Sequence, residues 1–148
     1  SSTSRGLGDV YKRQQFTGAC LCGKARYSAN ADPIFQAICH CKDCQRATGS
    51  AFEAIVAVPE ASLNMQGTLK GFSVKGTSGG TVTRNFCPDC GSTMLTRADA
   101  LPGMVLLLTG PMDDTSGFKP ARQIFCASAQ PGMQLAGLES FPGMPPLR

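Results

Sequence analysis

The sequence predicts an all-β domain, mainly strands with one or two short helical turns. Two observations indicate this fold class. Short apolar runs recur at intervals of roughly ten residues with turn residues between them, and 17 glycines and 10 prolines are spread over 148 residues. No segment sustains the 3.6-residue period of an amphipathic helix. Apolar residues make up 42% of the chain, enough for a core, and we expect a single domain over residues 16–148.

The first half of the chain carries clear turn signals. We expect a hairpin-like start over residues 18–29, where polarity alternates, and a strand over residues 34–40 after an Asp-Pro turn. Residues 42–48 are expected to form a short helix that ends at a glycine C-cap. The apolar run at residues 52–58 is expected to be a strand, and a proline stops it.

The second half is expected to contain shorter strands. The six strands expected there cover residues 63–66, 72–75, 81–86, 94–97, 104–109 and 123–127. The glycine-rich run at residues 76–81 lacks the Gly-Lys-Ser/Thr of a phosphate loop, so we expect a hairpin loop. The tail at residues 141–146 is expected to be an irregular strap or a frayed end.

Residues 1–15 differ from the rest of the chain because they have no apolar period and contain the basic pair Lys12-Arg13. Residues 9–14 (DVYKRQ) resemble the conceptual translation of a sequencing-library adapter. We therefore interpret residues 1–15 as a non-native or disordered segment and exclude them from the fold. The formal charge of the chain is +4 and falls to +2 without this segment. No basic stripe remains, so nucleic acid is not an expected partner.

Neither a membrane span nor a secretory signal is expected. The longest apolar runs, such as residues 104–108, have the length of one strand, whereas a membrane helix needs about 18 residues or more. Residues 1–15 contain basic residues with no apolar stretch after them, unlike a signal peptide. We therefore expect a soluble, cytoplasmic protein with no membrane partner. The sequence leaves the oligomeric state open.

Eight cysteines stand against one histidine and no tryptophan. Seven of them fall in three clusters, which are Cys20-Leu21-Cys22, Cys39-His40-Cys41-Lys42-Asp43-Cys44 and Cys87-Pro88-Asp89-Cys90. Disulfides fit poorly, because no secretory signal is expected and closely spaced cysteines on one strand face point to a common partner. Inert buried thiols suit Cys126 alone. Zinc binding is the interpretation that uses the other seven.

The seven clustered cysteines divide into four and three. The Cys87–Cys90 pair with its following glycine forms a zinc knuckle, and Cys20 with Cys22 can complete a closed four-cysteine site. The remaining three, Cys39, Cys41 and Cys44, would form an open site, the arrangement typical of catalytic zinc. Spacing alone leaves open whether Cys20 and Cys22 join that trio instead. We expect the His40 ring to point away from the thiol face and to support or pack beside the ligands, and a site of three cysteines plus His40 is the alternative.

Three motifs resemble those of the glutathione-dependent formaldehyde-activating (GFA) family, which is shared with centromere protein V. They are residues 18–27 (GACLCGKARY), 39–52 (CHCKDCQRATGSAF) and 86–92 (FCPDCGS). Residues 113–120 and 128–131 are similar to the C-terminal half of the family, so the resemblance covers about residues 16–145. In this family the C-terminal strand often carries tryptophan, whereas Phe125-Cys126 stands here. The resemblance therefore does not decide which residues form the wall of the pocket, nor which substrate it takes.

The resemblance implies a β-tent fold of small antiparallel sheets held by two zinc ions per chain. It implies a structural zinc on Cys20, Cys22, Cys87 and Cys90, and a second, catalytic zinc on Cys39, Cys41 and Cys44. The reaction that gives the family its name joins glutathione and formaldehyde into S-hydroxymethylglutathione, which makes the enzyme a carbon–sulfur lyase read in reverse. The expected partners are therefore a small thiol such as glutathione and an aldehyde.

An open zinc can lower the pKa of a bound thiol or polarise a carbonyl. Three thiolates make the site anionic, so we favour positioning of the thiol. Arg46 follows the cysteines directly and is the predicted glutathione contact, with Arg84 and Arg97 ranked lower. Asp43 and Glu53 are expected at the surface or a helix end and not as a general base.

Two other functions use the same cysteines. One is a non-catalytic binding module that zinc stabilises, and the other is a protein that responds to zinc or to oxidation. With seven thiolates and two zinc ions, the net charge of residues 16–148 would be about −1, close to neutral.

Overall fold

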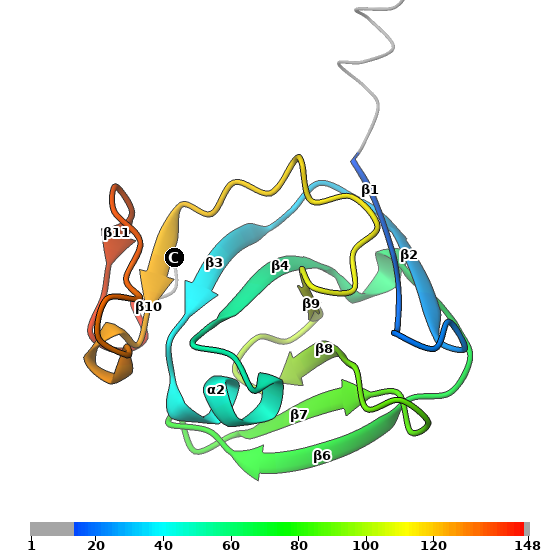
Figure 1. Cartoon of the computed structure of the whole chain (residues 1–148), viewed down its shortest axis with the longest axis horizontal. Helices are drawn as coiled ribbons and strands as arrows, with labels where there is room; N and C mark the ends of the chain where they lie inside the picture. The colour runs from blue at the N-terminus through cyan, green and yellow to red at the C-terminus, as the bar shows by residue number, and fades with distance from the viewer. Residues whose placement is uncertain (1–13, 147–148) are drawn as a thin grey trace, which may run out of the picture.

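The computed structural model describes residues 14–146 (Figure 1). The segment predicted to be non-native, residues 1–15, lies almost wholly outside the described residues, and β1 (Gln15–Ala19) begins one residue before the predicted domain start. The described residues form eleven strands and one α-helix, α2 (Lys42–Thr48), so the all-β prediction is confirmed. No helix in residues 14–146 has the length and apolar character needed to cross a membrane.

The strands form two sheets. The smaller sheet has the order β1-β2-β5, with β2 (Arg26–Asn30) at its centre and β5 (Leu63–Gln66) at one edge. The larger sheet has the order β11-β10-β3-β4-β9-β8-β7-β6. Its strands are β3 (Phe35–Cys39), β4 (Glu53–Pro59), β6 (Lys70–Lys75), β7 (Thr81–Phe86), β8 (Thr93–Ala98), β9 (Met104–Leu108), β10 (Arg122–Ile124) and β11 (Glu139–Ser140). Two 3₁₀ turns complete the fold, η1 (Glu60–Ser62) and η2 (Cys126–Ser128).

The two faces of β4 meet different neighbours, because successive side chains of a strand point to opposite faces. Val56 and Val58 pack with Tyr27 of the small sheet in the main core, whereas Ile55 and Ala57 belong to a second cluster on the other face. Burial on both faces explains why this strand reads as a continuous apolar run in the sequence. The large sheet curves around α2 (Figure 1).

The C-terminal edge of the large sheet departs from the predicted antiparallel pattern. Strand β10 runs parallel to β3, and β11 runs parallel to β10. The long connection over residues 109–121 carries the chain from β9 across the molecule, so β10 enters in the direction of β3. The strand predicted over residues 123–127 ends early at Ile124, because Phe125 adopts a left-handed backbone conformation (φ 55°) and η2 follows.

The tail forms a hydrogen-bonded strap along β10. Of the two predicted alternatives, a strap or a frayed end, the structure thus shows the strap. Backbone bonds join Phe141 N to Gln123 O (3.0 Å) and Phe125 N to Gly143 O (3.1 Å). The buried Gln123 side chain also binds the segment that leads into the strap. Its amide donates to Leu135 O (2.7 Å) and accepts from Leu135 N (3.1 Å), and its oxygen lies 2.9 Å from His40 Nε2.

We expect Gln123→Leu to lower the free energy of unfolding by about 3 kcal/mol. The apolar side chain would leave the buried His40 ring and the Leu135 amide without partners, and each orphaned group costs about 1–3 kcal/mol. Gln66→Leu is the control, because Gln66 is exposed on β5, and it should change stability by less than about 0.5 kcal/mol. Urea denaturation measures both. Equal effects of the two substitutions would show that the Gln123 network does not fasten the strap.

Candidate metal centres

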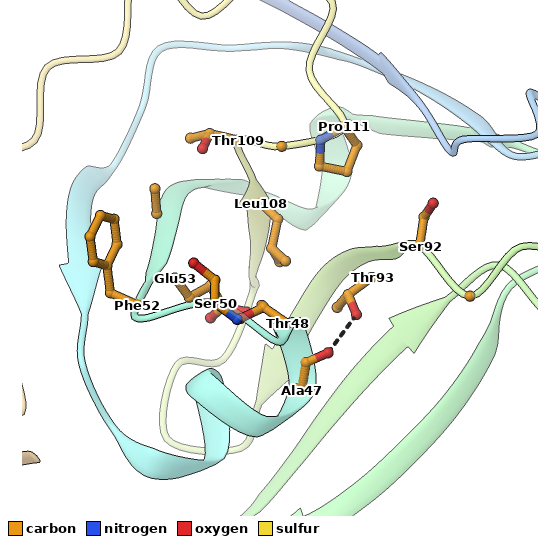
Figure 2. Close-up of a pocket in the computed structure, with 13 residues that line it drawn as sticks. Ala47, Thr48, Ser50, Phe52, Glu53, Ser92, Thr93, Leu108, Thr109 and Pro111 are labelled. Atoms are coloured by element: carbon orange, nitrogen blue, oxygen red, sulfur yellow. Dashed lines mark hydrogen bonds between the residues drawn. The ribbon is translucent and has the colours of Figure 1, made fainter. Parts of the chain in front are cut away.

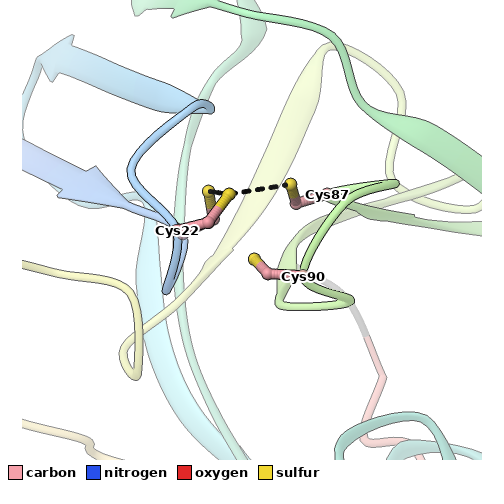
Figure 3. A group of neighbouring side chains, drawn as sticks. Cys22, Cys87 and Cys90 are labelled. Carbon is pink, nitrogen blue, oxygen red and sulfur yellow. Dashed lines mark hydrogen bonds between the residues drawn. The ribbon is translucent and has the colours of Figure 1, made fainter.

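Four cysteines converge where the small sheet meets the β7–β8 turn (Figure 3). The sulfurs of Cys20, Cys22, Cys87 and Cys90 all lie within 4.8 Å of one another, with Cys20 to Cys22 at 3.6 Å and Cys22 to Cys87 at 3.8 Å. Four sulfurs that are each about 2.3 Å from one zinc ion lie about 3.8 Å apart at the corners of a tetrahedron. All eight cysteines are free thiols in this structure. The donor set therefore fits a closed tetrahedral zinc site, and the pairing that spacing left open is Cys20 and Cys22 with Cys87 and Cys90.

Tight turns hold these four thiols close together. Cys87 N donates to Ser92 O, and Gly91 N donates to Cys87 O at a positive φ of 79° that glycine adopts without strain. The Ser92 hydroxyl accepts from Leu21 N and lies 3.2 Å from Cys90 Sγ, so it links the two cysteine-bearing loops. Hydrogen bonds from Ser92 lower the pKa of Cys90 to about 5, which favours the thiolate that a metal binds.

The other three cysteines gather at the start of α2. Cys39 ends β3, Cys41 is the helix N-cap, and Cys44 lies in the first turn. Their sulfurs lie within 4.8 Å of one another, with Cys44 to Cys39 at 3.5 Å. Within residues 14–146 no fourth His, Cys, Asp or Glu ligand atom lies within 4.8 Å of all three sulfurs. Hydrogen bonds from Cys39 and Cys44 hold the pKa of Cys41 far below its usual value. The group fits a metal that keeps one position open.

His40 does not join this cluster. Its side chain is fully buried, its Nε2 meets Gln123 Oε1, and its ring packs edge-on against Phe52 with centroids 5.5 Å apart. In the extended Cys-His-Cys segment the ring therefore points away from the thiols, as expected from strand alternation. The His40 carbonyl also accepts from Gln45 Nε2 (2.7 Å), which ties the cysteine segment to α2. His40 supports the ligand segment from the core side.

A cavity of about 380 Å³ opens over the three cysteines, on the face of the large sheet that turns away from the main core. Residues paired directly across neighbouring strands share a face. The row Phe35, Ala57, Leu106, Thr96 and Arg84 crosses five strands in register, and all of its members except Ala57 line the cavity. The β6–β7 loop and the C-terminal strap close its sides.

Of the ionisable side chains that line this cavity, Glu53 and Arg84 contact Cys44. Cys44 Sγ donates to Glu53 Oε2 (3.1 Å), and Arg84 Nη2 donates to Cys44 Sγ (3.6 Å). Burial raises the pKa of Glu53, which is only 3% exposed. Burial alone would lower the pKa of Arg84, but its bond to Cys44 and the nearby acidic groups raise the pKa above its usual value. Arg84 therefore stays cationic next to the thiols.

A family model described as glutathione-dependent formaldehyde-activating enzyme matches residues 15–128. The chain belongs to this family. A crystal structure of a Rhodobacter sphaeroides protein, a structural-genomics target, matches this GFA-family chain with a TM-score of 0.54 at 16% identity. The match covers 84% of this chain and 98% of that one, and at this identity it shows a shared fold. No curated protein matches the chain.

The remaining predicted residues of this GFA-family chain lie apart from the cysteines. Arg46 is exposed on α2 in a neighbouring surface pocket with Lys42 and does not line the three-cysteine cavity. Arg97 pairs with Glu60 through two hydrogen bonds. Cys126 is half-buried and belongs to neither cluster, with its Sγ 3.6 Å from Gln123 O. The glutathione contact assigned to Arg46 stays a prediction.

Sequence reasoning placed Glu53 wrongly and did not place Arg84 beside the cysteines. Glu53 was expected at the surface or a helix end, but it begins β4 and pairs with Cys39 in register, which turns its side chain inward. Arg84 was ranked below Arg46, but it reaches Cys44 from β7. A glutamate before an uninterrupted apolar strand was the available signal for Glu53. Nothing in the sequence signalled Arg84, because its place depends on the register of three strand pairs.

A second cavity of about 400 Å³, which Glu53 also lines, lies between the end of α2 and the turn after Cys90 (Figure 2). Thr93 Oγ1 donates to Ala47 O (3.1 Å) at its wall. None of the seven clustered cysteines lines this cavity, and it contains no cationic side chain. The three cysteines and Arg84 therefore line the other cavity and not this one.

Proposed function

We propose that this GFA-family chain is a zinc-dependent enzyme of the carbon–sulfur lyase type. It forms or cleaves the adduct between a thiol, such as glutathione, and formaldehyde or a similar aldehyde. The observation that carries the proposal is the cluster of three cysteines at the floor of a cavity. None of Cys20, Cys22, Cys87 and Cys90 lines the three cavities described above, which suits a structural ion. The proposal thus assigns one role to each cluster.

The three cysteines Cys39, Cys41 and Cys44 would hold the second zinc. Zinc bound there would lower the pKa of a substrate thiol or polarise an aldehyde oxygen. Arg84 supplies positive charge beside the thiols, and it offsets the negative charge that three thiolates and a substrate thiolate would bring together. The adjacent apolar walls limit the water that would compete for the adduct.

The charged parts of glutathione fit outside the cavity. Lys42 lines both the three-cysteine cavity and the neighbouring surface pocket that contains Arg46. These two cations form a basic rim where the carboxylates of a thiol held at the cysteines would lie. Arg46 is therefore proposed as a contact to the part of glutathione that extends over α2.

Removal of the second zinc is expected to abolish the activity and to spare the fold. The zinc-loaded chain should accelerate exchange between free and hydroxymethylated glutathione at least tenfold over buffer, about 1.4 kcal/mol of barrier. Exchange spectroscopy by NMR measures this rate. Mild chelation should return the rate to the buffer value with an unchanged circular dichroism spectrum, and added zinc should restore it.

The control is a strong chelator under denaturing conditions, which removes both ions and should also abolish the folded spectrum on return to buffer without zinc. An exchange rate equal to that in buffer, with two zinc ions bound, would refute the enzyme proposal. That result would favour the zinc-stabilised binding module instead.

A further inference from the structure

The cavity is far larger than formaldehyde requires. It measures about 380 Å³, whereas one water molecule occupies about 30 Å³ of liquid and formaldehyde has two heavy atoms. The volume is at the lower end of the range for small-molecule pockets and leaves space that formaldehyde does not fill. A further group of one of the reacting molecules is expected to fill this remaining space.

The walls of the cavity differ in polarity. The cysteines, Glu53 and Arg84 form one charged cluster. Phe35, Ile55, Leu101 and Leu106 belong to one hydrophobic cluster and form an apolar wall, and Thr96 lies between Leu106 and Arg84 in the cross-strand row. Peptide groups or carboxylates buried against these walls without partners would cost several kcal/mol. This apolar wall therefore suits a hydrocarbon group better than the polar body of glutathione.

The strap adds a wall of its own. Met144 lines the cavity, although the family match ends at residue 128. Met144 is a flexible apolar side chain and adapts to the shape of a bound hydrocarbon. This chain thus contributes an apolar contact from a segment outside the matched region.

We propose that the aldehyde that this chain couples to its thiol carries an apolar chain or ring, and that this group occupies the cavity between the cysteines and Leu106. The inference rests on the proposed function and names its substrate class. In the reaction the thiol sulfur bonds to the carbonyl carbon, the C=O double bond becomes a single bond, and the thiol proton passes to the oxygen. Cleavage reverses these changes, and no oxidant or reductant takes part.

Binding of inert analogues tests this inference apart from turnover. S-methylglutathione and S-hexylglutathione place one carbon and a six-carbon chain beyond the sulfur, respectively, and do not react. Each buried methylene contributes about 0.8 kcal/mol, up to about fourfold in affinity, so the hexyl compound should bind the zinc-loaded chain at least 30-fold more tightly. Isothermal titration calorimetry measures both constants. Equal affinities would overturn the inference.

Ala98→Leu provides the matched test of location, because Ala98 lines the cavity opposite Val82. It should reduce the ratio of hexyl to methyl affinity at least tenfold. Ala61→Leu adds the same side chain on exposed η1 and should leave the ratio unchanged. An Ala98→Leu protein that keeps the wild-type ratio would place the alkyl chain elsewhere and overturn the inference.

Turnover separates this inference from the proposed function. With glutathione as the thiol, hexanal should show a higher kcat/KM than formaldehyde. With formaldehyde as the aldehyde, benzyl mercaptan should show no higher kcat/KM than glutathione. A gain confined to benzyl mercaptan would assign the cavity to the thiol and overturn the inference. If no pair reacts faster than in buffer and the alkyl dependence of binding persists, the proposed function fails and the apolar site stands.

Discussion

Cys87→Ser is expected to unfold the domain. Cys87 and Cys20 are both buried in the main core, and their cluster joins the loop between β1 and β2 to the turn between β7 and β8. The free energy of binding a structural zinc is also free energy of folding, and the total stability of a domain is only about 5–15 kcal/mol. Loss of one of the four ligands should therefore remove most of the stability.

Circular dichroism and thermal melting measure this effect. The Cys87→Ser protein should show no cooperative transition above about 25 °C, because the expected loss of at least 5 kcal/mol reaches the lower limit of domain stability. Cys126→Ser is the matched control, since Cys126 lies outside both clusters. It should shift Tm by only a few degrees. A folded Cys87→Ser protein with a Tm within 5 °C of wild type would show that the four-cysteine site is not structural.

Cys41→Ser is expected to abolish the exchange reaction and to leave the fold intact. Cys41 is the N-cap of α2 and accepts from Cys44 N (3.2 Å), and serine is a preferred N-cap that accepts the same bond. The substitution therefore retains the helix start and replaces one thiolate ligand by a weak hydroxyl ligand. The second zinc should be lost and the four-cysteine site retained.

The exchange rate of glutathione with formaldehyde should fall to the buffer value in Cys41→Ser, at least tenfold below that of the wild type, as metal removal predicts. The melting temperature should stay within a few degrees of wild type. Wild-type exchange in a folded Cys41→Ser protein would exclude the three-cysteine cluster as the catalytic site. Cys126→Ser again serves as the control, with full activity.

The sequence was sufficient for the elements that local signals define. Clustered cysteines, a helix closed by glycine and apolar runs between turns indicated α2, most strands and the three cysteine clusters. Strand alternation also predicted that the His40 ring points away from the face that carries the cysteine sulfurs. These features depend on neighbours in the sequence, so a single chain reveals them.

Features that depend on distant pairing could not be predicted. The parallel edge at β10, the strap held by Gln123 and the approach of Arg84 to Cys44 arise from contacts between residues 12 to 85 positions apart in the sequence. Arg46 ranked above Arg84 because it lies near the cysteines in the sequence, whereas the register from β4 through β9 and β8 to β7 decides which side chain enters the cavity.

The central claim is that the chain holds two zinc ions, one in a closed site and one in an open site. Native mass spectrometry of the wild type and of Cys41→Ser tests it most directly. The account predicts two zinc ions in the wild type, one of which mild chelation removes, and one zinc ion in a folded Cys41→Ser protein. One ion in the wild type, or the same two ions in Cys41→Ser, would contradict it.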